Sequence, residues 1–165
     1  MADKAISALD ELGAAPANTD KLVIVDGSTT KYITAGNLIP AEIGIACSDE
    51  VTAITTGNTA ADTQKASILI PRAMTVTEVK CNLYKKADDD VTIDVNYHAS
   101  APETAARMLN AALSMTGTNL TATTSTFASA ATFFLLAEDS FVTVDVDDAG
   151  TTAFGLKVWL LGYWT

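Results

Sequence analysis

The segment VTIDVNY, residues 91–97, has an apolar or aromatic side chain at every odd position and a polar one at every even position. Successive side chains of a β-strand point to opposite faces of the sheet, so this alternation predicts a strand with one buried face. The same period of two returns in VTVDV, residues 142–146, and in FGLKVWL, residues 154–160. We therefore expect strands that bury one face each in a shared core.

Between residues 74 and 83 the alternation slips once. Apolar residues occupy even positions up to Val76 and odd positions from Val79, with Thr77 and Glu78 at the slip. One extra residue in an otherwise regular strand predicts a β-bulge. The following KKADDD, residues 85–90, predicts the turn of a hairpin that leads into residues 91–97.

Two stretches in the middle of the chain are less regular. Residues 103–113 favour a helix by intrinsic propensity, whereas the strands on both sides favour an extended conformation, and both readings stay open. Residues 116–132 are rich in Thr and suit a strand or an ordered loop. About eight short strands separated by turn signals are typical of a sandwich or jelly roll. We expect an all-β, jelly-roll-like antiparallel β-sandwich over residues 60–165.

The first 40 residues have a different pattern. Apolar residues at helical spacing begin the chain, and the run LVIV, residues 22–25, ends at a turn formed by Asp26 and Gly27. Tyr32 to Thr34 could pair back on this run as a second short strand. Such short elements bury little of one another, so residues 1–40 are predicted to be an arm with little structure of its own. Residues 41–59 are predicted to be a connector.

Composition excludes several classes of function. Lys and Arg total 10 against 20 Asp and Glu, the net charge is −10, and charged residues make up only 18% of the chain. Ala and Thr fill close to a third of it. Phosphate-backbone affinity comes from basic residues, so we expect no nucleic-acid partner. No apolar stretch is long enough to span a membrane, so we expect no membrane partner. The acidic start is unlike a signal peptide, so we expect the protein to be synthesised in a cytoplasm and not to be secreted.

No catalytic, cofactor or metal site is predicted. His98, the only histidine, is placed just after a strand, where a loop histidine is the simplest reading. The acidic runs at residues 88–90 and 145–148 could hold calcium, but they lack the EF-hand pattern and suit solvated turns. Cys47 and Cys81 match no zinc or redox spacing, and a disulfide between them stays open although a reducing cytosol disfavours it. No phosphate-binding glycine loop occurs.

Aromatic residues gather late in the chain. A core position is the plain reading for Phe154 and Trp159, and a sugar-binding surface is another. Because aromatic residues are enriched in protein interfaces, we favour a subunit interface. Its predicted residues are Trp159, Tyr163 and Trp164.

The N-terminal 39 residues resemble a short module found on many structural proteins of tailed bacteriophages. Three blocks carry this resemblance: K-x-I-S-x-L, D-x-L-x-I-V-D and T-x-K-x-I-T-x-x-N-L. The second half resembles a phage virion β-sandwich domain, through I-P-x-A-x-T-V-T-E-V, V-T-I-D-V, V-T-V-D-V-D-x-A-G and G-L-K-V-x-L-x-G. The first three blocks use Lys4, Ile6, Ser7, Leu9, Asp20, Leu22, Ile24, Val25, Asp26, Thr29, Lys31, Ile33, Thr34, Asn37 and Leu38, and the last four lie at residues 70–79, 91–95, 142–150 and 155–162.

The resemblance implies a non-enzymatic virion component. We expect a homotrimeric capsid decoration, or cement, protein that binds the major capsid protein on the exterior of the head and stabilises the mature capsid. The acidic charge suits this location, since packaged DNA would repel it. A single sandwich favours a decoration protein over a receptor-binding fibre. A head or tail fibre or adaptor protein remains an alternative, and a carbohydrate-binding module is a more distant one. Predicted contact residues of the arm are Ile6, Leu9, Leu12, Leu22, Ile24, Tyr32, Ile33 and Leu38.

Overall fold

The computed structural model describes residues 21–26, 29–34, 40–54, 64–86, 89–100, 105–150 and 152–165. The chain divides into two compact units, Met1–Ile39 and Pro40–Thr165. In the first unit, strand β1 (Lys21–Asp26) pairs antiparallel with β2 (Thr29–Thr34), and Leu22 lies opposite Ile33. This pairing confirms the hairpin predicted from the apolar run and its Asp-Gly turn.

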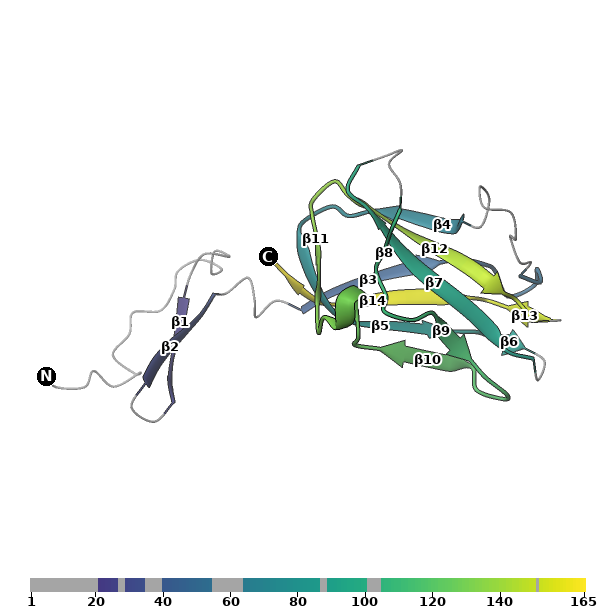
Figure 1. The fold of residues 1–165 in the computed structure, drawn as a ribbon, viewed down its shortest axis with the longest axis horizontal. Coiled ribbons are helices and arrows are strands. Elements are labelled where there is room, and N and C mark those ends of the chain that lie inside the picture. Colours follow the sequence, from purple (N-terminus) through teal and green to yellow (C-terminus); the bar gives the residue numbers. More distant parts are fainter. Residues whose placement is uncertain are drawn as a thin grey trace, which may run out of the picture. The chain divides into compact units, whose positions relative to one another are not determined.

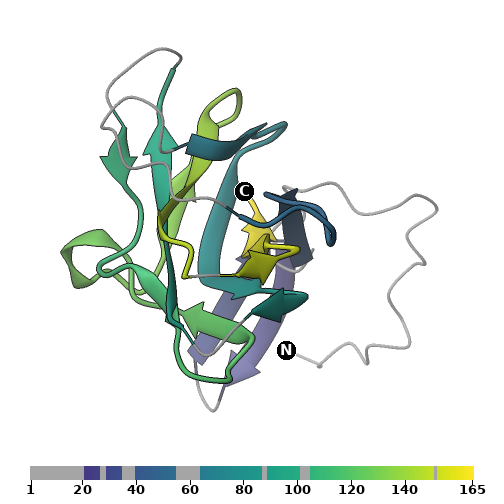
Figure 2. The same ribbon diagram turned by 90° about the vertical axis from the view of Figure 1, so that its right-hand side faces the viewer.

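The second unit is a sandwich of two five-stranded sheets (Figure 1). Figure 2 views it from one end, with the sheets as separate layers. One sheet has the order β3-β14-β5-β10, with β11 also paired to β5, and the other has the order β4-β12-β7-β8, with β9 also paired to β7. The bounds are β3 Pro40–Ala46, β4 Gln64–Leu69, β5 Met74–Asn82, β6 Lys85–Lys86, β7 Val91–His98, β8 Ala106–Arg107, β9 Leu113–Met115, β10 Thr121–Thr124, β11 Phe134–Leu136, β12 Phe141–Asp148, β13 Ala153–Phe154 and β14 Lys157–Trp164.

This strand order is that of a jelly roll. Every pairing among the described strands is antiparallel, and most steps along the chain cross from one sheet to the other. Strands β10 and β11 share one edge position, and β8 and β9 share another, so the sandwich has the eight positions of a jelly roll. The prediction of an all-β, jelly-roll-like sandwich is confirmed.

The core lies between the two sheets. The alternating residues of β7 and β12 point inward, and Ile93, Val95 and Val144 are fully buried. Phe127, between β10 and β11, is the largest fully buried side chain, and its ring centroid lies 6.2 Å from that of Phe134. Cores of this kind stabilise a domain by about 25 cal/mol for each Å² of apolar surface removed from water.

The predicted bulge is present in β5. Leu161 of β14 lies opposite Glu78, and the next residue, Gly162, lies opposite Val76, so Thr77 is the extra residue. A Cβ on Gly162 would clash with the carbonyl oxygen of Thr75. The close approach of the two backbones at this irregular step therefore requires glycine at position 162.

Three predictions about the boundaries of the sandwich need correction. The connector expected at residues 41–59 is wrong in its first part, because β3 is an edge strand of the sandwich and its Ala41, Ile43 and Ile45 are buried. The N-terminal unit accordingly ends at Ile39. The hairpin expected around residues 85–90 is also wrong, because β5 and β7 belong to different sheets. The turn there crosses the sandwich, and β6 pairs with β13 instead.

The irregular middle of the chain contributes to the core. Residues 105–113 form the short strand β8 and the start of β9 rather than a helix, and Met108 and Leu109 are fully buried. Tertiary burial of these two residues outweighs their helical propensity. The described part of the chain contains no helix long and apolar enough to cross a membrane.

Both cysteines are free thiols. Burial raises the pKa of Cys47 to about 12, and the nearby Cys81 adds to this shift. Burial also raises the pKa of Cys81 to about 11. Strand β14 lies between β3 and β5. Cys47 directly follows β3 and Cys81 lies in β5, so two strand spacings of about 4.8 Å separate their backbones by more than a disulfide can span.

Candidate functional site

The outer face of the sheet β3-β14-β5-β10 carries the principal candidate site. Trp159 on β14 lies opposite Gly44 on β3 and opposite Lys80 on β5. Directly opposed residues of an antiparallel pair project from the same face. Trp159 follows the buried Val158, so its half-buried indole faces away from the core.

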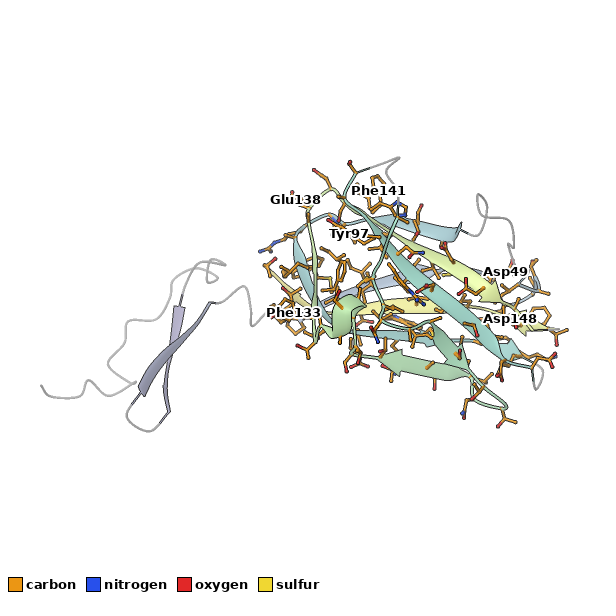
Figure 3. All side chains as sticks on the ribbon, in the orientation of Figure 1. Asp49, Tyr97, Phe133, Glu138, Phe141 and Asp148 are labelled. Carbon is orange, nitrogen blue, oxygen red and sulfur yellow. The ribbon has the colours of Figure 1, made fainter. Side chains whose placement is uncertain are left out.

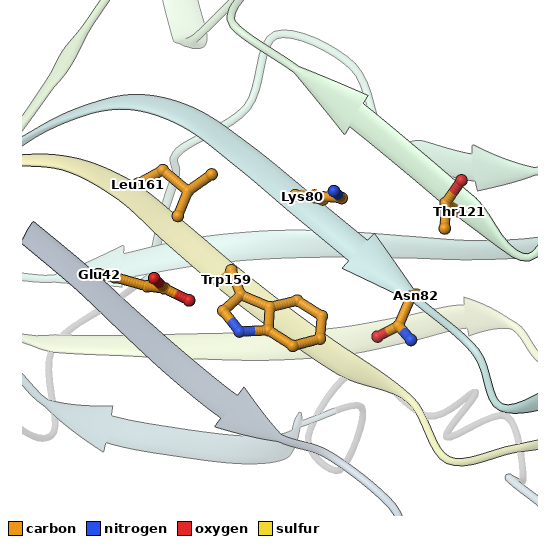
Figure 4. Close-up of a pocket in the computed structure, with 6 residues that line it drawn as sticks. All are labelled: Glu42, Lys80, Asn82, Thr121, Trp159 and Leu161. Atoms are coloured by element: carbon orange, nitrogen blue, oxygen red, sulfur yellow. The ribbon is translucent and has the colours of Figure 1, made fainter.

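A groove of about 420 Å³ lies beside this indole (Figure 4). Its size is within the range of small-molecule sites, although it is open along one side. Figure 4 shows Lys80 and Asn82 of β5 and Thr121 of β10 across the groove from Glu42 of β3. The complete lining is Glu42, Lys80, Asn82, Thr121, Trp159 and Leu161.

Asn82 is the unusual residue of this groove. Its Oδ1 atom is buried and has no hydrogen-bond partner among the described residues. Buried polar atoms are paired in the large majority of cases, and an unpaired one costs about 1–3 kcal/mol. Figure 4 shows the Asn82 amide on the side of the groove toward which the indole extends. A residue of the groove wall therefore carries a buried acceptor that the described residues leave without a hydrogen bond.

The indole lies beside Gly44 of β3. A Cβ built on Gly44 would lie 3.5 Å from Nε1 of Trp159, so the pyrrole edge lies against the bare backbone of β3. A second hollow of about 230 Å³ lies on that side, lined by Gly44, Ile45, Ala46, Lys157 and Trp159. The indole thus forms a wall of two adjoining hollows.

The aromatic residues predicted as one interface fall into separate environments. Trp164 packs against the hydrophobic core of its own sandwich. Tyr163 lies opposite Thr75, which lies opposite Leu135 of β11, so these three share the outer face beyond the Trp159 groove. Leu135 is 62% exposed and the neighbouring Phe133 is 49% exposed. Tyr163, Leu135 and Phe133, which we call the apolar end, therefore suit an interface better than Trp164 does.

The outer face of the other sheet is polar. Arg107 forms an ion pair with Asp94 at 2.7 Å, and Asn96 donates from Nδ2 to Oδ2 of Asp145 at 2.6 Å. Burial raises the pKa of both Asp94 and Asp145 above the usual value. These contacts satisfy the carboxylates of two directly opposed aspartates, whose charges would otherwise repel one another across the strands.

His98 belongs to this polar face. It is the last residue of β7 rather than a loop residue, and its Nε2 lies 3.2 Å from Oγ1 of Thr143. This hydrogen bond runs between two strands of the same sheet, and His98 lies opposite Phe141. The contact joins β7 to β12, so a role in holding these two strands together explains the histidine at this position.

The acidic runs lie at one end of the sandwich: residues 145–148 form the end of β12 rather than a turn, and Asp89 and Asp90 directly precede β7. Figure 3 shows Asp49 and Asp148 at that end and Phe133 at the opposite end. Asp90 accepts a hydrogen bond from the amide of Gly117, and Asp148 accepts one from Gly150. Among the described residues, no three His, Cys, Asp or Glu side chains are grouped to hold a metal ion.

The predicted arm contacts divide between described and undescribed parts of the chain. Leu22 and Ile24 lie in β1, and Tyr32 and Ile33 lie in β2, where the structure describes the backbone pairing. The remaining predicted contacts lie outside the described residues; these are Ile6, Leu9, Leu12 and Leu38.

Sequence reasoning identified Trp159 but missed the polar side of its groove. Lys80 and Asn82 occupy outward positions of a strand, and Glu42 lies in a segment predicted to be a connector. These positions converge only through the order β3-β14-β5-β10, which brings residues 42, 80, 121 and 159 together. The fold is that of a jelly-roll protein, and the outer face of one sheet carries this groove. Comparison with family models, curated proteins and solved structures gave no match for the chain.

Proposed function

We propose that the chain is a non-enzymatic structural component of a tailed-phage virion that decorates and cements the outer surface of the mature capsid. The observation that carries the proposal concerns the N-terminal module. Two of its three resemblance blocks, around residues 20–26 and 29–38, contribute the paired strands β1 and β2. These strands belong to a unit separate from the jelly roll, which begins at Pro40. An attachment module followed by a folded outer domain is the organisation that such a role needs.

In the proposed mechanism the two units bind different partners. The N-terminal unit binds the major capsid protein, and the jelly roll associates into a homotrimer over a junction of capsid subunits. Once one N-terminal unit of a trimer is bound, the other two are at a high effective concentration near their own binding sites. Three weak attachments therefore give strong overall binding. Internal pressure that separates capsid subunits would have to break these contacts as well. The net charge of −10 supports a location away from the packaged DNA.

The apolar end is the surface that we propose for trimer contacts. Leu135 and Phe133 are large apolar side chains that stay well exposed in the isolated chain. Leu135 shares the outer face with Tyr163 across Thr75 of β5, and among the described strands β11 pairs with β5 alone, at the edge of the sheet. Association of three copies would cover both the side chains and the open edge.

Deletion of residues 1–39 tests this proposal. The jelly roll is a compact unit from Pro40 onward, so the truncated protein is expected to stay folded and trimeric by circular dichroism and light scattering. It should no longer sediment with expanded capsids of the parent phage, whereas the full chain should. A matched full-length variant, Leu22→Glu with Ile24→Glu, should lose binding in the same way. Capsid binding by the truncated protein would contradict the proposal.

A head or tail fibre, or an adaptor that contacts the host, is the second candidate function. The observation that favours it is the Trp159 groove, because an exposed aromatic site with polar groups is suited to a ligand on a cell surface. Immunogold labelling of intact virions separates the candidates. A decoration protein labels the whole head, and a fibre or adaptor labels one vertex or the tail.

A further inference from the structure

The groove beside Trp159 combines three features that a single ligand class explains: a flat aromatic wall, an unpaired buried amide oxygen, and flanking side chains that donate and accept hydrogen bonds. We propose that this groove binds a neutral glycan, with one sugar ring stacked on the indole of Trp159. The inference holds whether or not the chain is a virion protein.

The indole supplies the stacking surface. One face of a pyranose ring presents C–H groups, and the face of an aromatic ring is the negative side of its quadrupole, so the two attract one another. The pyrrole edge of Trp159 lies against β3 at Gly44. A side chain held in this way loses little further freedom when a ligand stacks on it.

Asn82 supplies a reason for a hydroxyl ligand. Its Oδ1 atom is buried without a partner, and rotation about the last side-chain torsion, which has a broad minimum, would turn the amide into the groove. There a ligand hydroxyl could donate to Oδ1. A hydroxyl can also accept from the amide nitrogen, so it suits either end of the Asn82 amide.

The remaining polar groups favour a neutral ligand. Glu42 and Lys80 line opposite sides of the groove, and among the described residues neither forms an ion pair. Their charges balance, so the groove has no net preference for an anion or a cation. Each can instead hydrogen-bond to hydroxyl groups, as can Thr121. A purely apolar partner would leave these groups desolvated and unpaired, which disfavours it.

The second hollow indicates more than one sugar unit. It shares the indole with the first groove and extends along β3 toward Ala46 and Lys157. A ligand with one ring on Trp159 could therefore place a neighbouring ring beside Gly44. A short oligosaccharide fits this arrangement better than a monosaccharide.

A glycan array tests the inference, with the full chain probed against neutral and acidic oligosaccharides of bacterial lipopolysaccharide, capsule and cell wall. We expect binding to at least one neutral oligosaccharide, which is then titrated by calorimetry. Trp159→Ala should weaken that affinity at least about tenfold. Asn82→Ala should weaken it about fivefold, the loss of one hydrogen bond. The matched controls Trp164→Phe and Val51→Ser, which lie outside the groove, should bind like the unaltered chain.

Fluorescence gives a second readout that does not depend on a change in affinity. The chain has 2 tryptophans, so in Trp164→Phe the indole emission comes from Trp159 alone. Addition of the bound oligosaccharide should shift this emission. The proposal is overturned if no oligosaccharide on the array binds, if only acidic ones bind, or if affinity is unchanged in a folded Trp159→Ala protein.

Discussion

The carbonyl oxygen of Thr75 occupies the space in which a side chain at Gly162 would begin. Gly162 lies opposite Val76, the neighbour of Thr75, where β5 carries its extra residue, Thr77, opposite β14. Gly44, on the other side of β14, has ample room, since a Cβ there would make ordinary contact with Trp159 at 3.5 Å. The two glycines of neighbouring strands therefore have different structural roles.

Gly162→Ala is expected to destabilise the protein by about 1–3 kcal/mol, because the added methyl group must push two backbones apart. Gly44→Ala is the matched control and should change the free energy of unfolding by less than about 1 kcal/mol, since alanine also restricts the unfolded chain. Urea denaturation followed by circular dichroism measures both. Equal urea midpoints for the two variants would show that position 162 does not require glycine.

Asp145→Asn is expected to stabilise the fold at pH 7. Burial raises the pKa of Asp145, the Asp147 charge adds to this, and the Asn96 hydrogen bond opposes it. The folded state therefore keeps this proton to a higher pH than the unfolded chain, whose aspartate titrates near pH 4. As the pH rises from about 4 through the folded pKa, the free energy of unfolding falls, and this loss is complete above that range.

The gain at pH 7 should be small, about 0.5 kcal/mol, because solvent screens a half-exposed carboxylate. It should disappear at pH 3, where Asp145 is neutral in both states. Thermal melts at the two pH values measure it, with Glu138→Gln, an exposed site, as the control for loss of one negative charge. A gain that persists undiminished at pH 3 would rule out titration of Asp145 as its source.

Cys47 and Cys81 are expected to resist alkylation in the folded protein. With thiol pKa values raised to about 12 and about 11, only about one molecule in 10,000 and one in 1,000 carries the thiolate at pH 8. Iodoacetamide followed by mass spectrometry should label neither thiol in buffer and both in guanidinium. Val51→Cys, at a position 84% exposed, should be labelled rapidly as a positive control. A disulfide found in the unreduced protein would contradict the separation of Cys47 and Cys81 by strand β14.

Leu135→Glu is expected to dissociate the proposed trimer. A charge at the apolar end would be buried without a partner in the assembly, whereas in the monomer it faces water. Light scattering at micromolar concentration should give the trimer mass for the unaltered chain and the monomer mass for this variant. Val51→Glu, in a distant loop, should stay trimeric. A monomer mass for the unaltered chain would contradict the proposed assembly.

The strands with strict alternation could be predicted from sequence, because apolar residues at every second position all lie on the same face of a strand. Residues 91–97 and 142–146 form strands as expected, and the slip at residues 77 and 78 correctly predicted the bulge. The alternation over residues 154–160 is instead interrupted at Gly155 and Leu156, which separate β13 from β14. Register and pairing partners are non-local, so the same pattern could not show that residues 85–90 cross between sheets. Phe127 was missed as a core residue because Thr and Ala surround it and no alternation marks its buried face.

The site was predicted only in part for the same reason. A tryptophan at an outward strand position signals an interface or a ligand surface, and Trp159 has that position. Glu42, Asn82 and Thr121 come from strands far apart in the chain, so nothing local marks their convergence. The strand order of the jelly roll is the information that the sequence pattern lacks.

A cryo-electron microscopy reconstruction of virions tests the central proposal most directly, with the chain located by comparison with virions that lack it. We predict difference density on the outer surface of the head, as three jelly-roll domains around a symmetry axis, connected by N-terminal segments to the major capsid protein. Difference density confined to the neck or tail, or inside the shell, would contradict the cement role.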